Sequence, residues 1–156
     1  MTSSRFEWNT VQPEIGAAMV ALSGAVKKAA ADVGIDELLL HLIDIRASQL
    51  NGCAFCLDMH TREARKAGAT DNHLLAVTTW QESPRFSAQE RAVLALAEAV
   101  TTLGEGYVSD EVYAQAKAEF ADDQVAVLIW RATVINSWNR IVLGSRTRIP
   151  ASHLKD

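Results

Sequence analysis

The sequence has few cysteines, few prolines and no long apolar segment. Its 156 residues include two cysteines and three prolines, which excludes a disulfide-rich secreted scaffold because such a scaffold needs several cysteine pairs. The apolar segments 38–43 and 125–135 are shorter than the roughly 20 residues that span a bilayer, and Arg131 interrupts the second. Residues 1–8 lack the apolar core of a signal peptide. We therefore expect a cytoplasmic protein that has no membrane segment.

The amino-acid balance favours an all-α, globular protein that does not bind nucleic acid. Apolar residues make up 49% of the chain and charged residues 22%, a proportion that supports a packed core. The formal net charge is −4 and no cluster of lysine and arginine stands out, so the basic footprint of a nucleic-acid-binding protein is missing. No segment alternates polar and apolar residues over the length of a strand, and alanine, leucine and glutamate dominate.

Capping and breaking residues divide the chain into seven predicted helices. Pro13 suits a first helical turn, Asp36 can cap the next helix, and Ser87 with Glu90 forms a capping box. The predicted helices cover 13–31, 37–50, a segment that carries both cysteines and ends at 67–68, 70–77, 87–103, a segment that begins at 109, and 122–143. We expect one domain over residues 1–156, with a helical core at 13–143 and a terminal arm on either side. The helix at 37–50 is apolar nearly all round, which places it in the middle of a bundle.

Both cysteines belong to one Cys-x-x-Cys motif, Cys53 and Cys56, and His60 follows four residues later. On a helix, Cys56 and His60 are i, i+4 neighbours about 6 Å apart at Cβ. Cys53 and Cys56 are then close enough for a disulfide, and all three side chains share one face. A thiol that an imidazole can deprotonate, beside a second thiol, is the minimum requirement for a thiol peroxidase or a dithiol oxidoreductase.

The spacing favours Cys56 as the nucleophile. His60 lies one turn from Cys56 and two turns from Cys53, so it is better placed to accept the Cys56 proton. Cys53 then condenses with the resulting sulfenic acid to form a disulfide. The break at Asn51 and Gly52 puts the motif near the positive end of a helix, which lowers a thiol pKa.

Two other interpretations of the motif stay open on the residues alone. Cys53, Cys56, His60 and His41 together offer the four ligands that a structural zinc site needs. Alternatively, the cysteines are small buried apolar side chains and nothing more. Because no second Cys-x-x-Cys or closely spaced histidine pair accompanies the motif, we favour redox chemistry and expect no metal, flavin or haem.

His41 stands in an apolar segment, where a buried polar group needs a partner. One interpretation is a core histidine that bonds to a backbone carbonyl or to Asp44, three residues on. The other is a histidine that faces the cysteine helix and exchanges protons with His60.

Three polar residues of the last predicted helix, and three tryptophans of the chain, allow a similar choice. For Asn136, Asn139 and Arg140 we favour a polar stripe that satisfies neighbouring helix ends over an oligomer contact or a wall of a peroxide pocket. We expect the tryptophans in the core or at an interface, not at a substrate platform: Trp80, Trp130 and Trp138.

Residues 46–61, RASQLNGCAFCLDMHT, resemble the AhpD-like alkylhydroperoxidases of the carboxymuconolactone decarboxylase superfamily. The similarity continues through 64–68, 86–91 and 135–140. It implies an all-α fold, a symmetric homo-oligomer (often a trimer or hexamer) and peroxidase activity in which the second cysteine, here Cys56, reacts with the peroxide. The implied partners are an organic hydroperoxide as substrate and a dithiol or lipoyl-type protein as reductant.

Two positions depart from the family pattern. The family has a glutamate twelve residues before the first cysteine, where this chain has His41. The carboxylate of the proton relay is therefore expected to be missing, unless Glu37 replaces it from one turn earlier. Phe55 stands where the best-known member has a histidine. These departures keep open a redox-responsive sensor or scaffold protein that turns over slowly. Lactone decarboxylation fits less well, because that branch usually lacks the cysteine pair.

Overall fold

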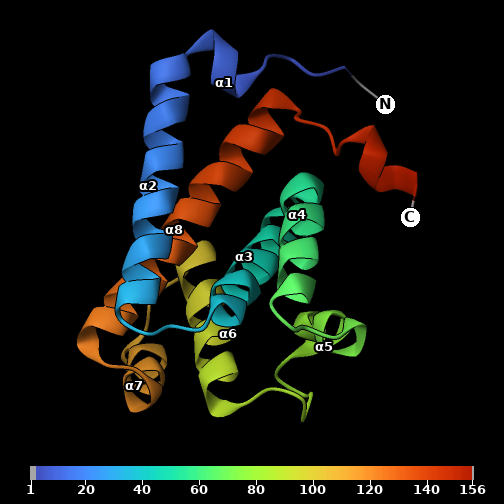
Figure 1. Ribbon diagram of the computed structural model, residues 1–156. Helices are drawn as coiled ribbons and strands as arrows, with labels where there is room; N and C mark the ends of the chain where they lie inside the picture. The colour runs from blue at the N-terminus through green and yellow to red at the C-terminus, as the bar shows by residue number, and fades with distance from the viewer. Residues whose placement is uncertain (1–2, 156) are drawn as a thin grey trace.

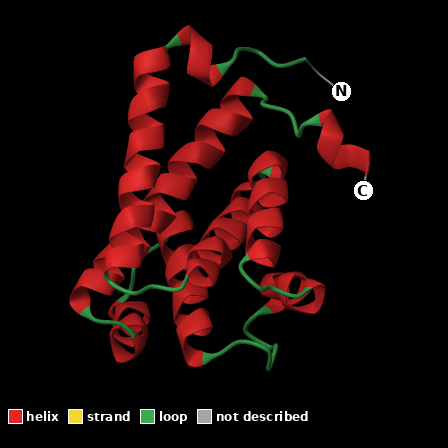
Figure 2. Cartoon of the chain, in the orientation of Figure 1, coloured by secondary structure: helices red, strands yellow, loops and turns green. Residues whose placement is uncertain are grey.

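The computed structural model of the protein describes residues 3–155, and every regular element in that range is a helix (Figures 1 and 2). The all-α prediction is confirmed. The α-helices are α1 (Trp8–Val11), α2 (Pro13–Asp32), α3 (Glu37–Asn51), α4 (Ala54–Lys66), α5 (Asp71–Ala76), α6 (Ala88–Thr101), α7 (Asp110–Glu119) and α8 (Asp122–Ser145), and the 3₁₀ helices are η1 (Val77–Thr79) and η2 (Ala151–Lys155). The seven predicted helices correspond to α2–α8, and the short α1 was not predicted.

Side-chain caps fix the helix starts that the sequence predicts. Asp36 accepts a hydrogen bond from the N–H of Leu38 at 2.8 Å and so begins α3. Ser87 accepts from the N–H of Glu90 at 3.2 Å, and the Glu90 carboxylate accepts from the N–H of Ser87 at 2.8 Å, which completes the capping box of α6. Each cap satisfies N–H groups that have no partner within the helix.

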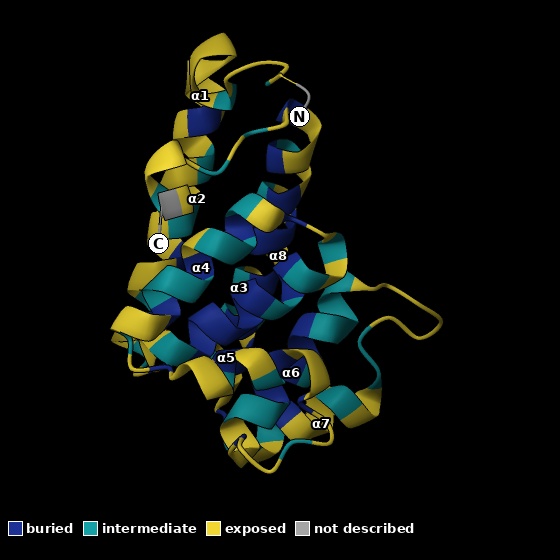
Figure 3. Cartoon of the chain, turned by 90° about the vertical axis from the view of Figure 1, so that its right-hand side faces the viewer, coloured by how far each residue is buried: buried dark blue, intermediate teal, exposed yellow. Residues whose placement is uncertain are grey.

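Helix α3 lies at the centre of the bundle, as predicted for the helix at 37–50. It packs against α4, α6 and α8, and its residues in Figure 3 are largely buried. The side chains of Leu42, Ile43 and Ile45 are completely buried. Since α3 adjoins both the cysteine helix and α8, polar groups on α3 can contact either one.

Both terminal segments pack on the bundle. In Figure 1 α1 lies at the end of the bundle where α2 begins and α8 ends. The ring of Trp8 meets that of Trp138 edge to face, with centroids 4.8 Å apart. At the other terminus, His153 of η2 lies with its Nδ1 2.8 Å from the Asp58 carboxylate of α4. Within residues 3–155, no helix is both long enough and apolar enough to cross a lipid bilayer.

Candidate active site

The first cysteine does not lie on the helix, contrary to the prediction that all three side chains share one helical face. Helix α4 begins at Ala54, and Cys53 is its N-cap with extended backbone angles of φ −87° and ψ 90°. Gly52, which ends α3 in the left-handed conformation with φ 69°, makes the turn between the two helices. The Cys53 Sγ accepts a hydrogen bond from the N–H of Cys56 at 3.4 Å. The two thiols are therefore neighbours because Cys53 acts as a cap.

Both thiols are buried, with 1% of each cysteine exposed, and they have opposite acidities. The thiol of Cys56 donates to Cys53, and this bond, together with the backbone N–H, lowers the pKa of Cys53 to about 7 despite burial. The same thiol–thiol bond, reinforced by burial, raises the pKa of Cys56. The amide of Asn139 lowers the pKa of both thiols. On Cys56 it therefore opposes the increase that the thiol–thiol bond and burial cause. A thiolate in the resting pair therefore forms on Cys53 first.

His60 faces a buried carboxylate from the central helix. Its Nδ1 lies 3.1 Å from Oδ2 of Asp44. Asp44 is completely buried and also forms a two-pronged ion pair with Arg131 of α8, in which Nε donates to Oδ1 at 2.8 Å and the terminal nitrogen donates to Oδ2. Burial alone would raise the pKa of Asp44, but Arg131, His60 and His41 outweigh it and hold that pKa well below its usual range. Asp44 is therefore a fixed negative charge.

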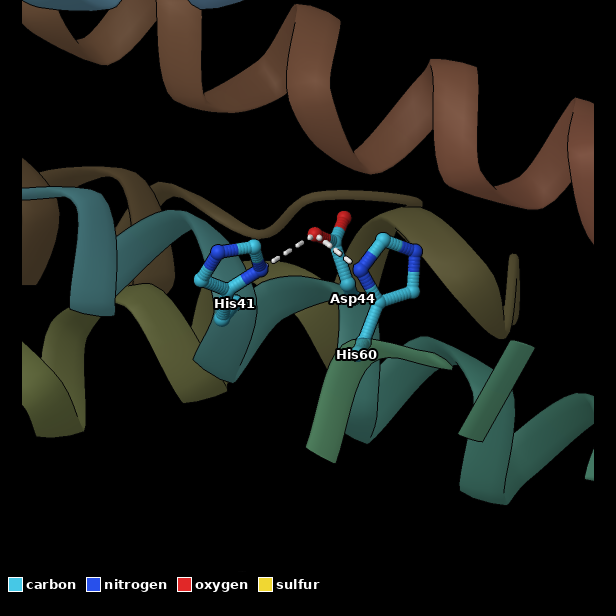
Figure 4. A group of neighbouring side chains, drawn as sticks. All are labelled: His41, Asp44 and His60. Carbon is cyan, nitrogen blue, oxygen red and sulfur yellow. Dashed lines mark ion pairs between the residues drawn. The ribbon is translucent and has the colours of Figure 1, made fainter. Parts of the chain in front are cut away.

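The same oxygen of Asp44 also faces His41 (Figure 4). The Nδ1 of His41 lies 3.5 Å from Oδ2, and its Nε2 lies 3.8 Å from the carboxylate of Glu37. The His41 and His60 rings are 5.7 Å apart between centroids. Neither Nδ1 atom is aligned to donate a hydrogen bond, so both buried nitrogens contact Asp44 electrostatically without one.

These contacts correct the prediction that the relay carboxylate is missing. Asp44 supplies a carboxylate to His60 from three residues beyond His41, and Glu37 is not the group that does so. His41 lies next to both groups named in the two interpretations, since its Nδ1 faces Asp44 and its ring lies 5.7 Å from that of His60, and proton exchange between the two histidines stays a prediction. The sequence carried a signal for this role, because a buried charge on an apolar helix needs a partner on another helix.

The structure does not assemble the zinc site considered from the sequence. Within residues 3–155, the group of metal-ligand side chains that comes together is His41, Asp44 and His60, with ligand atoms within 4.8 Å of one another. Neither cysteine belongs to that group. The Arg131 guanidinium already occupies both oxygens of Asp44, and its positive charge opposes a cation at the same carboxylate.

The polar residues on α8 contact the end of α3 through side chains. The side chain of Asn51, the last residue of α3, donates to Asn136 at 2.8 Å and to Asn139 at 2.9 Å. Asn139 in turn donates to Ser48 at 3.1 Å. This network ties α8 to the turn that carries the cysteines, so Asn139 has both a structural contact and an electrostatic effect on the thiols.

An apolar cavity of about 340 Å³ opens beside His60. Asp44, His60 and Arg131 supply its ionisable groups, while Phe55 and Met59 of α4 belong to its apolar wall. The rest of that wall comes from α1, α2 and α8, and includes Trp8, Val20, Trp138 and Val142. Trp138 therefore lines a cavity, which was not expected from the sequence. The cysteines are not among the lining residues, and His60 adjoins the cavity one helical turn from Cys56.

A helical bundle with a capped cysteine pair, a histidine and a buried carboxylate fits the AhpD-like resemblance of the sequence. Residues 13–99, more than half of the chain, match the carboxymuconolactone decarboxylase family. The chain belongs to that family.

One of two individual relatives extends the likeness to nearly the whole chain. The uncharacterized protein YdfG of Bacillus subtilis is 35% identical over 94% of this chain and 97% of its own length. The uncharacterized protein YnjA of Escherichia coli is 34% identical over 43% of this chain and 37% of its own length.

Solved structures share the fold. A protein of unknown function from Agrobacterium tumefaciens, provisionally assigned to antioxidant defence as AhpD, superimposes with a TM-score of 0.89 at 35% identity, covering 96% of this chain and 99% of that one. The debrominase Bmp8 in complex with 2,3,4-tribromopyrrole superimposes with a TM-score of 0.78 at 20% identity, covering 91% of this chain and 74% of that one. At that identity the second likeness concerns the fold alone.

Proposed function

We propose that the protein is a thiol-dependent peroxidase that reduces organic hydroperoxides through the Cys53–Cys56 couple. His60 accepts the proton of the Cys56 thiol, the sulfur attacks the outer oxygen of the hydroperoxide, an S–O bond forms and the O–O bond breaks. The alkoxide leaves as an alcohol with a proton from His60, and Cys56 becomes a sulfenic acid. Cys53 then attacks that sulfur, the disulfide forms and water leaves. A dithiol or lipoyl-type protein reduces the disulfide and closes the cycle.

The observation that carries the proposal is the contact between His60 and Asp44 one helical turn from Cys56. Burial is the largest influence on His60 and lowers its pKa, and the charges of Arg131 and His41 lower it further against the attraction of Asp44. His60 is therefore neutral near pH 7 and can accept a proton. Asp44 then stabilises the imidazolium that forms, in the way a buried carboxylate supports a catalytic histidine.

A good thiol nucleophile needs both a large thiolate fraction and a high intrinsic nucleophilicity. These two properties are divided between the two cysteines. Cys53 has the lower pKa, but its sulfur accepts hydrogen bonds from Cys56. Because nucleophilicity falls as a thiol pKa falls, the stabilised Cys53 thiolate is the weaker attacker. Cys56 has the higher pKa and a base one helical turn away on α4, so we assign the attack to Cys56 and the resolving step to Cys53.

Membership of a family that contains AhpD-type enzymes supports this reaction class.

We place the protein in the cytoplasm, where reductants keep an unpaired Cys-x-x-Cys couple available for catalysis. As the resemblance implies, we also propose a homo-oligomer, a trimer or a hexamer, which light scattering of the purified protein would determine. We propose no metal or other cofactor for the reaction.

A second candidate is a redox-responsive sensor with the same disulfide chemistry. The burial of both thiols favours it, since access limits the rate at which a thiol meets a peroxide. A steady-state assay with excess dithiol and an alkyl hydroperoxide separates the two functions. The peroxidase consumes many equivalents of hydroperoxide, whereas the sensor consumes one equivalent and stops.

The roles of the cysteines are tested by trapping. Cys53→Ser should still consume one equivalent of hydroperoxide and leave a sulfenic acid on Cys56 that a dimedone probe captures. Cys56→Ser should react no faster than a free thiol. Trapping of the sulfenic acid on Cys53 in the Cys56→Ser protein, at the wild-type rate, would reverse the assignment.

A further inference from the structure

Two tryptophan side chains separate the cavity beside His60 from a second cavity. The proposed reaction does not by itself require this separation. The second cavity, also of about 340 Å³, adjoins the first near the N-terminal segment. Trp8 and Trp138 line both cavities. The two indoles meet edge to face with centroids 4.8 Å apart. They therefore stand between the His60 cavity and the second cavity.

One half of this pair of indoles is anchored from within the bundle. The Nε1 of Trp138 donates to Ser23 of α2 at 2.8 Å, and the Ser23 hydroxyl donates to the carbonyl of Met19 at 2.9 Å. These bonds fix the orientation of the Trp138 ring against α2.

The other half comes from the N-terminal segment. The backbone N–H of Arg5 donates to the carbonyl of Ser145 at 2.9 Å, and its side chain donates to the carbonyl of Gly144 at 3.2 Å. Gly16 of α2 leaves space for the Trp8 ring, because a Cβ there would lie 3.3 Å from two ring carbons of Trp8. The segment that carries Trp8 is thus held at Arg5, and the Trp8 ring packs closely on Gly16.

This pair of indoles belongs to parts of the chain outside the family match. That match covers residues 13–99 and includes the cysteines, His60 and Asp44. Trp8 precedes that range and α8 follows it. The reacting groups and the two indoles that separate the cavities therefore come from different parts of the sequence.

We propose that Trp8 is a specificity-determining residue that selects hydroperoxides with a compact apolar body about the size of one aromatic ring. This inference rests on the proposed peroxidase function. A cavity of this volume is at the small end of ligand sites, which span about 300–1,000 Å³. Its apolar walls hold the organic group, and its ionisable end at His60 holds the peroxide oxygens. Hydrogen peroxide gains nothing from those walls, and a long alkyl chain is stopped by the indoles.

Removal of Trp8 should join the two cavities and change the order of substrates. The experiment compares kcat/KM for hydrogen peroxide, cumene hydroperoxide and the hydroperoxide of methyl linoleate, with excess dithiol. The wild type should prefer cumene hydroperoxide over hydrogen peroxide by about tenfold or more, the scale of apolar discrimination in a pocket. In Trp8→Ala this preference should fall about tenfold while the long-chain hydroperoxide gains. Trp8→Phe should keep most of the preference.

The matched control is Trp130→Ala, which removes an indole that is 55% exposed and does not line either cavity. It should leave the order of substrates unchanged. An unchanged order in Trp8→Ala, or a wild type that prefers hydrogen peroxide, would overturn the assignment of Trp8.

A binding measurement separates failure of this inference from failure of the proposed function. The alcohol product, 2-phenyl-2-propanol, should quench tryptophan fluorescence of the wild type, and Trp8→Ala should bind it about tenfold more weakly. If no hydroperoxide is turned over yet the alcohol binds in this way, the peroxidase function fails and the cavity assignment stands. Equal affinity of the two proteins for the alcohol would contradict the cavity assignment whatever the turnover.

Discussion

The Nδ1 atom of His60 lies 3.1 Å from Oδ2 of Asp44, and this contact joins the helix of the cysteines to the central helix of the bundle. Asp44 also pairs with Arg131, so the carboxylate that serves His60 is held from a third helix. The position of this carboxylate beside His60 therefore depends on the packing of α3, α4 and α8 together.

Replacement of Asp44 should affect stability as well as activity. Asp44→Asn leaves the Arg131 guanidinium, which is largely buried, without its negative partner. Removal of one member of a buried ion pair costs about 3–5 kcal/mol of unfolding free energy. Denaturant unfolding should show this loss, and Asp44→Asn combined with Arg131→Met should lose less. If the single and the double variant lost the same free energy, the pair would not be coupled as described.

The acidity of Cys53 can be measured directly. Its pKa of about 7 means that the thiolate appears as the pH rises through neutrality, well below the range of an ordinary cysteine. Ultraviolet thiolate absorbance of the reduced protein should follow that midpoint. Cys56→Ala removes the donor thiol and should move the midpoint to higher pH. A midpoint that stays in place would show that the thiol–thiol bond is not its cause.

His60 should act as the base in the peroxide step. His60→Asn keeps a polar side chain but cannot accept a proton, and it should lower kcat/KM for the hydroperoxide by about a hundredfold or more. The pH profile should also lose its limb on the acid side. His73→Asn, which alters a histidine of α5 outside this site, serves as the control and should leave both the rate and the profile unchanged.

His41 should tune His60 through charge. The charge interaction with His41 lowers the pKa of His60, so His41→Gln should raise that pKa. Activity needs neutral His60 and therefore increases as the pH rises through the His60 pKa. A raised pKa displaces this limb to higher pH. A limb that moved to lower pH in His41→Gln would contradict the electrostatic role.

The helices around this site could be predicted from the sequence because the signals that start and end them lie within a few residues of the helix ends. Asp36, Ser87 and the turn at Gly52 act on residues a few positions away, so helix starts and ends can be predicted from short patterns. The buried position of the helix at 37–50 follows from its apolar surface. The spacing of Cys56 and His60 likewise needs only the helical repeat.

The remaining features depend on contacts between distant segments. Cys53 was placed on the helix because spacing does not distinguish the N-cap from the first turn. The role of Asp44 was missed because it arises from the approach of α3 to α4. Trp8 could not be placed in the cavity wall because it meets Trp138 across 130 residues of sequence.

Rapid mixing tests the central claim most directly. Fully reduced, metal-free protein is mixed with cumene hydroperoxide, and the loss of thiols and the mass of the product are followed. The account predicts loss of both thiols to a Cys53–Cys56 disulfide within one chain, much faster than free cysteine is oxidised. Oxidation no faster than that of free cysteine, or a product without that disulfide, would contradict the peroxidase assignment.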